Sequence, residues 1–365
     1  MGKIDELIKQ FCPDGVQKVP LGDVLDYEQP SKYIVKSTEY DNSYNIPVLT
    51  AGKGFLLGYT NEQAGVYAAS EENPTIIFDD FVTSFHWVDF PFKVKSSAMK
   101  MLTCKNKGNS FRFIYYAMCE IGFVAKEHSR HWISVYSKIE IPLPPLAVQK
   151  KIVEILDTFT GMIDNLQKEL EQRQKQFEYY RSKFFAYNED ECDWFSLPMI
   201  SENCDRKRKP IKGSKREKGI YPYYGASGIV DYVKDYILDG EYLLISEDGA
   251  NLVARNTPIA FSIEGKNWVN NHAHVVKFNS LNDQRFVEYY FNSIDLTPWI
   301  SGGAQPKLNQ ENLNKILIPY PSVERRNIIV DTLKSFEALI SNIKQEIELR
   351  QKQYKYYREK LLTFE

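Results

Sequence analysis

The fold is decided by the stretch KIEIPLPPLAVQKKIVEILDTFTGMIDNLQKELEQRQKQFEYYR, residues 138–181, which returns as KILIPYPSVERRNIIVDTLKSFEALISNIKQEIELRQKQYKYYR, residues 315–358. The two copies align without a gap and share roughly twenty identities. Both open with Lys-Ile-x-Ile-Pro-x-Pro, and both close with Arg-Gln-Lys-Gln, an aromatic residue, one variable residue and Tyr-Tyr-Arg. A chain made of two such halves has quasi-two-fold geometry within one polypeptide, which suits a target with two half-sites.

Apolar residues follow the prolines of each copy at alternating spacings of four and three. The first copy places them at Ile152, Leu156, Phe159, Ile163, Leu166, Leu170, Phe177, Tyr180 and Phe184. The second copy places them at Ile329, Leu333, Phe336, Ile340, Ile343, Ile347, Tyr354, Tyr357 and Leu361. This heptad seam predicts two helices of about 40 residues, ~60 Å each. Because a lone amphipathic helix of that length does not stay monomeric and soluble, we expect the two seams to pack on each other.

The orientation of the two helices is not decided by connectivity, since a whole domain separates them. Antiparallel packing relates the halves by a two-fold axis and places one globular domain at each end, so symmetry favours it. One seam position is charged in both copies, at Arg173 and Arg350. A buried charge costs stability but can fix the register of a coiled coil, whereas an arginine that reaches past its neighbours to water has no such role. Both interpretations stay open.

The segments that precede the two helices repeat more faintly. Matching places carry predicted buried strands, Thr75–Phe78 and Tyr242–Ile245, and predicted helices, Phe113–Tyr116 and Val287–Tyr290. Short strand-like runs separated by Gly, Asn and Asp are typical of a mixed α/β domain with long loops. We therefore expect an α+β protein, in which two mixed α/β domains in pseudo-two-fold arrangement are joined by two long helices packed as an antiparallel coiled coil. The expected boundaries are 1–137 for the first domain with a short N-terminal helix, 138–188 for the central helix, 189–314 for the second domain and 315–365 for the C-terminal helix.

Composition and charge bound the class of protein. The 365 residues are 43% hydrophobic and rich in Tyr and Phe, as expected of a folded chain with room for two domains. The net charge is −2, but Arg206–Lys218 (RKRKPIKGSKREK) holds eight basic residues and one acid, which predicts a polyanion contact at one face. The five cysteines lack metal-site spacing, and neither a signal peptide nor a membrane-spanning run is recognised. We expect a cytoplasmic protein with reduced thiols and no membrane partner.

The sequence offers no self-contained catalytic machinery. A Walker loop, a Gly-x-Gly-x-x-Gly turn and the Asn/Asp-Pro-Pro-aromatic motif of adenine methyltransferases are absent. The carboxylate pairs Asp79-Asp80 and Glu247-Asp248 lack the nearby lysine of a nuclease, and we interpret them as turn or capping residues. We therefore expect no catalytic residue, no metal site and no cofactor in this chain. The alternatives are a stand-alone nuclease or methyltransferase, and a coiled-coil adaptor without sequence-specific DNA reading.

Further motifs lie at the start of the chain and before the second helix. Phe11–Val16 read Phe-Cys-Pro-Asp-Gly-Val, Leu21–Val24 read Leu-Gly-Asp-Val, and Gln305–Asn309 read Gln-Pro-Lys-Leu-Asn. With the doubled Ile-x-Ile-Pro-x-Pro and long helix, these motifs make essentially the whole chain resemble the specificity subunit of type I restriction–modification systems. The first half departs from the pattern at Ser129–Ile133, where a loop role is transferred less directly.

The resemblance implies a division of labour among several chains. Each globular half would be a target recognition domain that reads one half of a split, asymmetric sequence in double-stranded DNA, and the helices would set the spacing of the half-sites. Two modification subunits would carry S-adenosylmethionine and methylate adenine. Restriction/translocase subunits would hydrolyse ATP with Mg²⁺ and cut the DNA. The missing chemistry would then belong to the partners.

Candidate DNA-contacting residues can be chosen by their chemistry. Cations neutralise phosphates, while Arg pairs with guanine, and Asn or Gln with adenine. The basic candidates are Arg206, Lys207, Arg208, Lys209, Lys212, Lys215 and Arg216. The remaining candidates of the second domain are Asn251, Arg255, Gln305, Lys307 and Asn309. Those of the first domain are Lys53, Ser84, His86, Arg130 and His131. For any one of them the alternative is an ordinary polar loop residue. Because the two domains differ in these loops, we expect two different half-sites.

Overall fold

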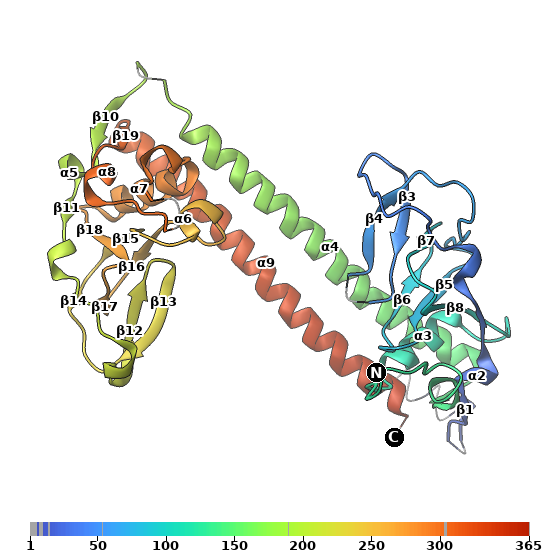
Figure 1. The fold of residues 1–365 in the computed structure, drawn as a ribbon. Coiled ribbons are helices and arrows are strands. Elements are labelled where there is room, and N and C mark those ends of the chain that lie inside the picture. The colour runs from blue at the N-terminus through green and yellow to red at the C-terminus, as the bar shows by residue number, and fades with distance from the viewer. Residues whose placement is uncertain are drawn as a thin grey trace. The chain divides into compact units, whose positions relative to one another are not determined.

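The computed structural model describes residues 6, 10–13, 15–52, 54–188, 190–302 and 305–364. The chain forms two compact units, each of which combines a globular domain with parts of two long helices (Figure 1). Unit one consists of Met1–Leu166 with Glu346–Glu365, and unit two of Gln167–Gln345. The expected N-terminal helix falls largely outside the described residues. Among those described, no helix is both long and apolar enough to cross a membrane.

The domain of unit one is built on two sheets. The four-stranded sheet is antiparallel and has the order β2 (Leu25–Glu28), β8 (Met99–Cys104), β5 (Thr75–Asp79) and β6 (Phe85–Val88). The three-stranded sheet has the order β4 (Leu56–Thr60), β3 (Ile46–Leu49) and β7 (Lys93–Val94). Strand β3 pairs antiparallel with β4 and parallel with β7. Short helices α2 (Leu21–Val24) and α3 (Phe111–Cys119) complete the domain.

The domain of unit two repeats this topology with one additional strand, β14, at the edge of its second sheet. Its first sheet has the order β11 (Glu202–Asn203), β18 (Ala273–Lys277), β15 (Tyr242–Ser246) and β16 (Ala260–Ile263). Its second sheet has the order β13 (Gly228–Val233), β12 (Lys218–Gly225), β17 (Lys266–Val269) and β14 (Leu238–Asp239), and the β12–β17 pair is again parallel. The helices are α5 (Leu197–Ile200), α6 (Asn251–Ala254), α7 (Leu281–Ser293) and α8 (Gln310–Leu313). Both expected strands and both expected helices are present at matching positions.

The central strands β5 and β15 are apolar on both faces because both faces are covered. In β5, Ile76 and Phe78 pack in the cluster that contains α3, while Ile77 packs with Phe92 and Met99 on the opposite side. This is the two-residue alternation of a strand, with each face given its own core. Strand β15 does the same with Leu243 and Ile245 on one side and Leu244 on the other.

The duplicated Ile-x-Ile-Pro-x-Pro segment closes each domain before its long helix begins. In unit one it forms β9 (Glu140–Pro142), which pairs with β1 (Lys18–Pro20). In unit two it forms β19 (Leu317–Tyr320), which pairs with β10 (Asp193–Ser196). Proline cannot donate to a ladder and is favoured where a helix starts, so the following prolines end each strand and permit the helix.

The long helices are α4 (Leu146–Phe184, 39 residues) and α9 (Val323–Thr363, 41 residues), close to the predicted length. Each unit contains the start of one helix and the end of the other. In unit one, Ile152 and Leu156 near the start of α4 share an apolar cluster with Leu361 near the end of α9. In unit two, Leu333 near the start of α9 lies in the cluster against which Phe184, at the end of α4, packs. The helices are therefore antiparallel, and the predicted fold class is confirmed.

An aromatic pair occurs in the same form in both units. Phe159 stacks on Tyr357 with ring centroids 5.3 Å apart, and Phe336 stacks on Tyr180 at 5.5 Å. The sequence offset that relates the two helix copies takes Phe159 to Phe336 and Tyr180 to Tyr357. The same phenylalanine–tyrosine contact is therefore made twice with the roles of the two helices exchanged, as in a two-fold dimer interface.

Each domain is also bonded to the helix that follows it. In unit one, Arg112 and Tyr116 of α3 both bond the carboxylate of Asp157 on α4. In unit two, Arg285 and Tyr289 of α7 bond the carboxylate of Glu337 on α9, at 2.6 and 2.8 Å. These bonds fix the domain helix against the long helix that follows it.

The charged seam residues do not enter the core. Arg173 bonds Glu169 and Gln176 of its own helix, and Arg350 bonds Glu346 and Gln353 of its own. About a third of each arginine side chain remains exposed, 37% and 36%. Of the two interpretations, the arginine that reaches past its neighbours to water is the one observed.

Reciprocal packing predicts equal losses of stability at equivalent positions. Leu156 and Leu333 occupy the same place in the two copies and are both fully buried, so Leu156→Ala and Leu333→Ala should each lower the free energy of unfolding by about 2–5 kcal/mol. Thr158→Ala and Ser335→Ala are matched controls, because both side chains are exposed hydroxyls that bond only their own helix. Urea denaturation of the four variants checks this. A loss below about 1 kcal/mol at either leucine would contradict the packing.

Candidate nucleic-acid interface

The basic run Arg206–Lys218 of unit two follows β11 and is tied to the second sheet through its backbone. The amide of Lys209 donates to the carbonyl of Val269, and the indole of Trp268 donates to the carbonyl of Lys209 at 2.5 Å. Farther along, the amide of Ile211 donates to the hydroxyl of Tyr223 at 3.0 Å. Tethering the backbone leaves the side chains to project outward.

The seven basic candidates of this run fall into two groups. Arg208 donates to Glu247 and to the carbonyl of Ala273, and Arg216 lies over the ring of Tyr223 at 4.4 Å and pairs with Asp231. These two arginines hold the domain together. The exposed group consists of Arg206, Lys207, Lys209, Lys212 and Lys215. Within the described part of the chain, none of these five side chains forms an ion pair, so all five can neutralise phosphates.

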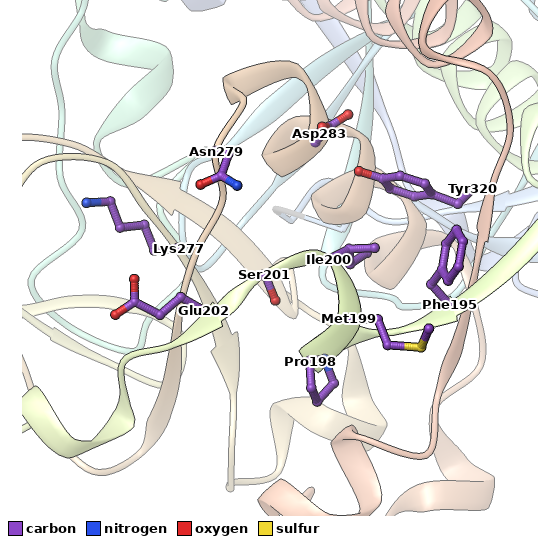
Figure 2. Close-up of a pocket in the computed structure, with 10 residues that line it drawn as sticks. All are labelled: Phe195, Pro198, Met199, Ile200, Ser201, Glu202, Lys277, Asn279, Asp283 and Tyr320. Atoms are coloured by element: carbon purple, nitrogen blue, oxygen red, sulfur yellow. The ribbon is translucent and has the colours of Figure 1, made fainter.

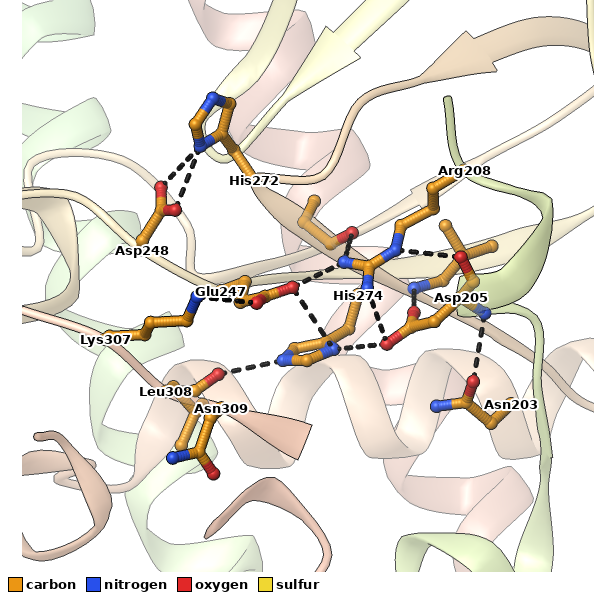
Figure 3. Close-up of polar contacts among 12 residues, drawn as sticks. Asn203, Asp205, Arg208, Glu247, Asp248, His272, His274, Lys307, Leu308 and Asn309 are labelled. Carbon is orange, nitrogen blue, oxygen red and sulfur yellow. Dashed lines mark hydrogen bonds and ion pairs between the residues drawn. The ribbon is translucent and has the colours of Figure 1, made fainter. Parts of the chain in front are cut away.

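A buried network of charges lies beneath the basic run (Figure 3). The ring of His274 meets Asp205 at 2.7 Å through Nδ1 and the carbonyl of Leu308 at 2.8 Å through Nε2. Arg208 bonds both Asp205 and Glu247, and the ammonium group of Lys307 lies 3.2 Å from Glu247. Burial alone would raise the pKa of Glu247, but Arg208, His274 and Lys307 hold that pKa below its ordinary value of 4.5. The pKa of Asp205 is likewise lowered, since bonds from His274 and the Val275 amide outweigh its desolvation.

The spacing of Asp205, Glu247 and His274 would also fit a metal ion, because their ligand atoms lie within 4.8 Å of one another. The donor chemistry does not fit. A metal-binding imidazole needs a nitrogen with a free lone pair, whereas both nitrogens of His274 face groups that only accept protons, the Leu308 carbonyl and the ionised Asp205. Arg208 already forms ion pairs with both carboxylates. The group is therefore an ion-pair network.

The two second-domain loops chosen for base reading do meet in space. The amide of Gly249 donates to the carbonyl of Pro306, and the backbones of Asp248 and Lys307 form an isolated antiparallel β-bridge. Gln305 and Lys307 are exposed. The side-chain oxygen of Asn309 caps the N-terminus of α8, where it accepts a hydrogen bond from the Asn312 amide at 2.9 Å.

Asn251 and Arg255 hold their own loop. The Asn251 amide group bonds the backbone of Thr257 in both directions, at 3.0 Å each. The Arg255 guanidinium donates to the carbonyls of Asn292 and Ile294 at the end of α7, and Arg255 itself has a positive φ of 51°. Both side chains shape the loop, and the predicted contact of either with DNA stays a prediction.

In unit one, Ser84 and His86 both contact the backbone of a neighbouring loop. The Ser84 hydroxyl donates to the carbonyl of Ala51, and Nε2 of His86 lies 3.1 Å from the carbonyl of Gly52. Lys53, the next residue, lies outside the described residues. The structure thus brings Ser84 and His86 to the backbone of Ala51 and Gly52.

Arg130 is half exposed and lies beside an aromatic stack that the sequence did not single out. Its guanidinium is 5.9 Å from the ring of Phe81, which in turn stacks on His128 at 4.6 Å. Phe81 lies directly after a buried strand and its acid pair, and this position was the sequence signal that could have identified it. His131 is different, because its side chain is buried and bonds the carbonyl of Glu127.

The acid pairs are structural, as interpreted. Asp79 accepts from the amides of Phe81 and Val82 and closes the β5–β6 turn, while Asp80 pairs with Lys100 and accepts from the Trp132 amide. In unit two, Asp248 bonds His272 at 2.9 Å, and Glu247 belongs to the network of Figure 3.

A surface hollow of about 590 Å³ lies elsewhere in unit two (Figure 2). Its lining residues are Phe195, Pro198, Met199, Ile200, Ser201, Glu202, Lys277, Asn279, Asp283 and Tyr320. None of the predicted DNA-contacting residues lines this hollow, so it is distinct from the candidate interface.

The lowered pKa of Glu247 predicts how its contribution depends on pH. A carboxyl group with a depressed folded-state pKa stabilises above its ordinary pKa, and that stabilisation is lost as the pH falls through the lowered value. Glu247→Gln should therefore cost unit two about 3 kcal/mol at pH 7 and progressively less below about pH 4. Hydrogen exchange of unit-two peptides in wild type and variant measures this difference. Glu264→Gln, at an exposed acid of the same unit, is the control. A cost that stays constant down to pH 3 would refute the ion-pair assignment.

Comparison with known proteins is consistent with this geometry. The model of the type I restriction modification DNA specificity domain matches the chain twice, over residues 13–173 and 195–349. The EcoR124I/EcoR124II specificity subunit of Escherichia coli is 37% identical over 100% of this chain and 98% of its own length. A putative type I restriction enzyme specificity subunit of Haemophilus influenzae is 38% identical over 48% of this chain and 47% of its own.

The fold agrees with solved structures as well. The S subunit of a type I restriction–modification system from M. genitalium superimposes with a TM-score of 0.65 at 16% identity, covering 95% of this chain and 96% of that one. The chain therefore belongs to the type I restriction–modification DNA specificity family, as the sequence-specific DNA-binding and non-catalytic subunit of such a complex.

Proposed function

We propose that this chain reads a bipartite, asymmetric DNA target, with one half-site assigned to each domain. Residues 1–137 and 189–314 are the two target recognition domains, and residues 138–188 and 315–365 are the spacer helices between them. The observation that carries this proposal is the repeated topology of the two domains on a reciprocal helix pair, combined with loops that differ.

The equivalent loops differ most clearly in charge. Between β2 and β3, residues 29–45 hold two lysines and two acids, whereas between β11 and β12, residues 204–217 hold seven basic residues and two acids. Loops of such different charge on the same scaffold present different surfaces to DNA. This supports two unlike half-sites and therefore an asymmetric target.

Individual roles follow from exposure and bonding. In the second domain, Arg206, Lys207, Lys209, Lys212 and Lys215 neutralise phosphates, and Gln305 and Lys307 face the bases. Asn309, whose side-chain oxygen caps α8, shapes the loop that carries them. In the first domain, Lys53, Ser84, His86 and Arg130 contact the DNA. Arg208, Arg216, Asn251, Arg255 and His131 act by shaping the loops that carry these side chains.

The partners complete the reaction. A chain with two equivalent halves offers two equivalent places for modification subunits, which carry S-adenosylmethionine and methylate adenine on each strand. Restriction/translocase subunits use ATP and Mg²⁺. A solved chain from a study of type I complex assembly has a TM-score of 0.55 to this one at 14% identity, covering 96% of this chain and 98% of that one. Because the substrate is DNA, we place the complex in the cytoplasm. The adaptor alternative is disfavoured, since the apolar residues near both ends of each seam already pack in the cores of the two units.

Methylome sequencing of a strain that carries the complex tests the proposal. We expect methylated adenines in a motif of two unlike defined words separated by an unspecified gap of fixed length, with the word centres about one helical turn apart. A strain that lacks this chain but keeps the modification subunit is the control, and its motif should be absent. A single continuous palindrome would contradict the proposal.

A further inference from the structure

One polar arrangement occurs at the same place in both domains. Strand pairing sets Phe78 opposite Lys100 in unit one and Ile245 opposite His274 in unit two. Two residues after Phe78 comes Asp80, and two residues after Ile245 comes Glu247. In each domain, a carboxylate that directly follows the central strand therefore stands beside a basic side chain of the neighbouring strand.

Both pairs are buried. The Lys100 ammonium lies 2.9 Å from Asp80, and both side chains are only 1% exposed. Nδ1 of His274 lies 3.8 Å from Glu247, with side chains 1% and 12% exposed, and Asp205 and Arg208 add a second ion pair around them. Because an unpaired buried charge is strongly unfavourable, the members of each pair hold one another in place.

Each carboxylate residue also anchors a loop through its backbone. The carbonyl of Asp80 accepts from the amide of His131 at 2.8 Å, and the carbonyl of Glu247 accepts from the amide of Leu308 at 2.7 Å. Side-chain bonds strengthen both anchors. Asp80 accepts from the Trp132 amide, and His274 meets the Leu308 carbonyl (Figure 3). The loops at 129–132 and 306–309 are therefore structural equivalents, although they share no residue in register.

The residue before each anchored amide is a cation that points toward solvent while its charged end remains near the carboxylate. Arg130 is 52% exposed and lies 3.9 Å from Asp80. Lys307 is 49% exposed and lies 3.2 Å from Glu247. The cluster of Asp80, Lys100 and Arg130 holds one more positive than negative charge, and the surplus sits on the exposed Arg130. In unit two the exposed cation of the cluster is Lys307. Arg and Lys are the side chains that pair with guanine in the major groove, provided that they are held in a fixed place.

We propose that Asp80 with Lys100, and Glu247 with His274, are equivalent positioning pairs, each of which holds the cation that reads its own half-site, Arg130 or Lys307. The inference rests on the proposed two-half-site function and adds which residues fix the readers. Loss of one pair should impair recognition of one half-site and leave the other intact.

The test uses the complex of the full chain with its modification subunits, and DNA duplexes that carry the methylome-defined target with one half-site randomised at a time. Discrimination is the ratio of Kd for the randomised duplex to Kd for the intact one. Asp80→Asn with Lys100→Met removes both charges of the first pair together, so the thermal midpoint should stay near that of the wild type. Discrimination at the first half-site should fall about tenfold, with discrimination at the second unchanged.

Matched variants separate positioning from folding. Arg130→Gln should reproduce the loss of the double variant, and Lys307→Gln should produce a loss at the second half-site alone. Lys107→Gln, at an exposed cation beyond the far end of β8, should change neither. Lys100→Met alone should lower the thermal midpoint, because it leaves Asp80 unpaired.

Three outcomes would overturn the inference: full discrimination in the double variant, full discrimination in Arg130→Gln, or equal losses at both half-sites. Should the double variant not fold, the two reader variants decide. If the wild-type complex itself does not discriminate against a randomised half-site, the proposed function fails, which is a result distinct from unchanged variants.

Discussion

The packing of the start of each long helix against the end of the other is the constraint on which this protein depends. Phe159 on Tyr357 and Phe336 on Tyr180 are one contact made twice, once in each unit. Neither helix can bury its seam without the other copy, so each unit contains parts of both. Duplication within one chain thereby produces the reciprocal interface that a symmetric dimer forms from two chains.

The two domains of this chain share their strands and differ in their loops. The strands β5 and β15 bury apolar residues on both faces and set the position of everything that follows them. The polar side chains that face DNA in the proposed function come from loops, such as the β11–β12 connection and the segments 129–132 and 306–309 that bond the residues directly after these strands. Two domains can therefore keep one topology while the loops between β2 and β3, and between β11 and β12, carry very different charge. The chemistry of modification and cleavage is then left to other subunits.

The helices and their pairing could be predicted because a heptad pattern of apolar residues shows directly which face of a helix is buried. The antiparallel orientation was predicted from symmetry. The role of the arginines at 173 and 350 could not be predicted, because whether a long side chain enters a core depends on the space beside it. The central strands and the helices α3 and α7 were also accessible, because their apolar runs are local.

The loops were not accessible in the same way. Arg208 and Arg255 were chosen for their donors, but these donors satisfy a buried acid and two helix-end carbonyls that only the folded chain brings near. The equivalence of 129–132 and 306–309 is visible in their backbone hydrogen bonds. It could not be seen in the sequence, because the two loops share no residue in register. Polar residues serve tertiary structure and ligands with the same groups, so composition alone does not distinguish the two uses.

The most direct test of the reciprocal scaffold is to remove one heptad from both helices, residues 167–173 and 344–350, which are equivalent in the two copies. If the paired helices set the separation of the half-sites, seven residues at 1.5 Å each should shorten the unspecified gap in the methylome motif by about three base pairs, with both words unchanged. Removal from one helix alone should abolish methylation, because the seams would no longer meet in register. An unchanged gap in the double deletion, or normal activity of the single deletion, would contradict the account.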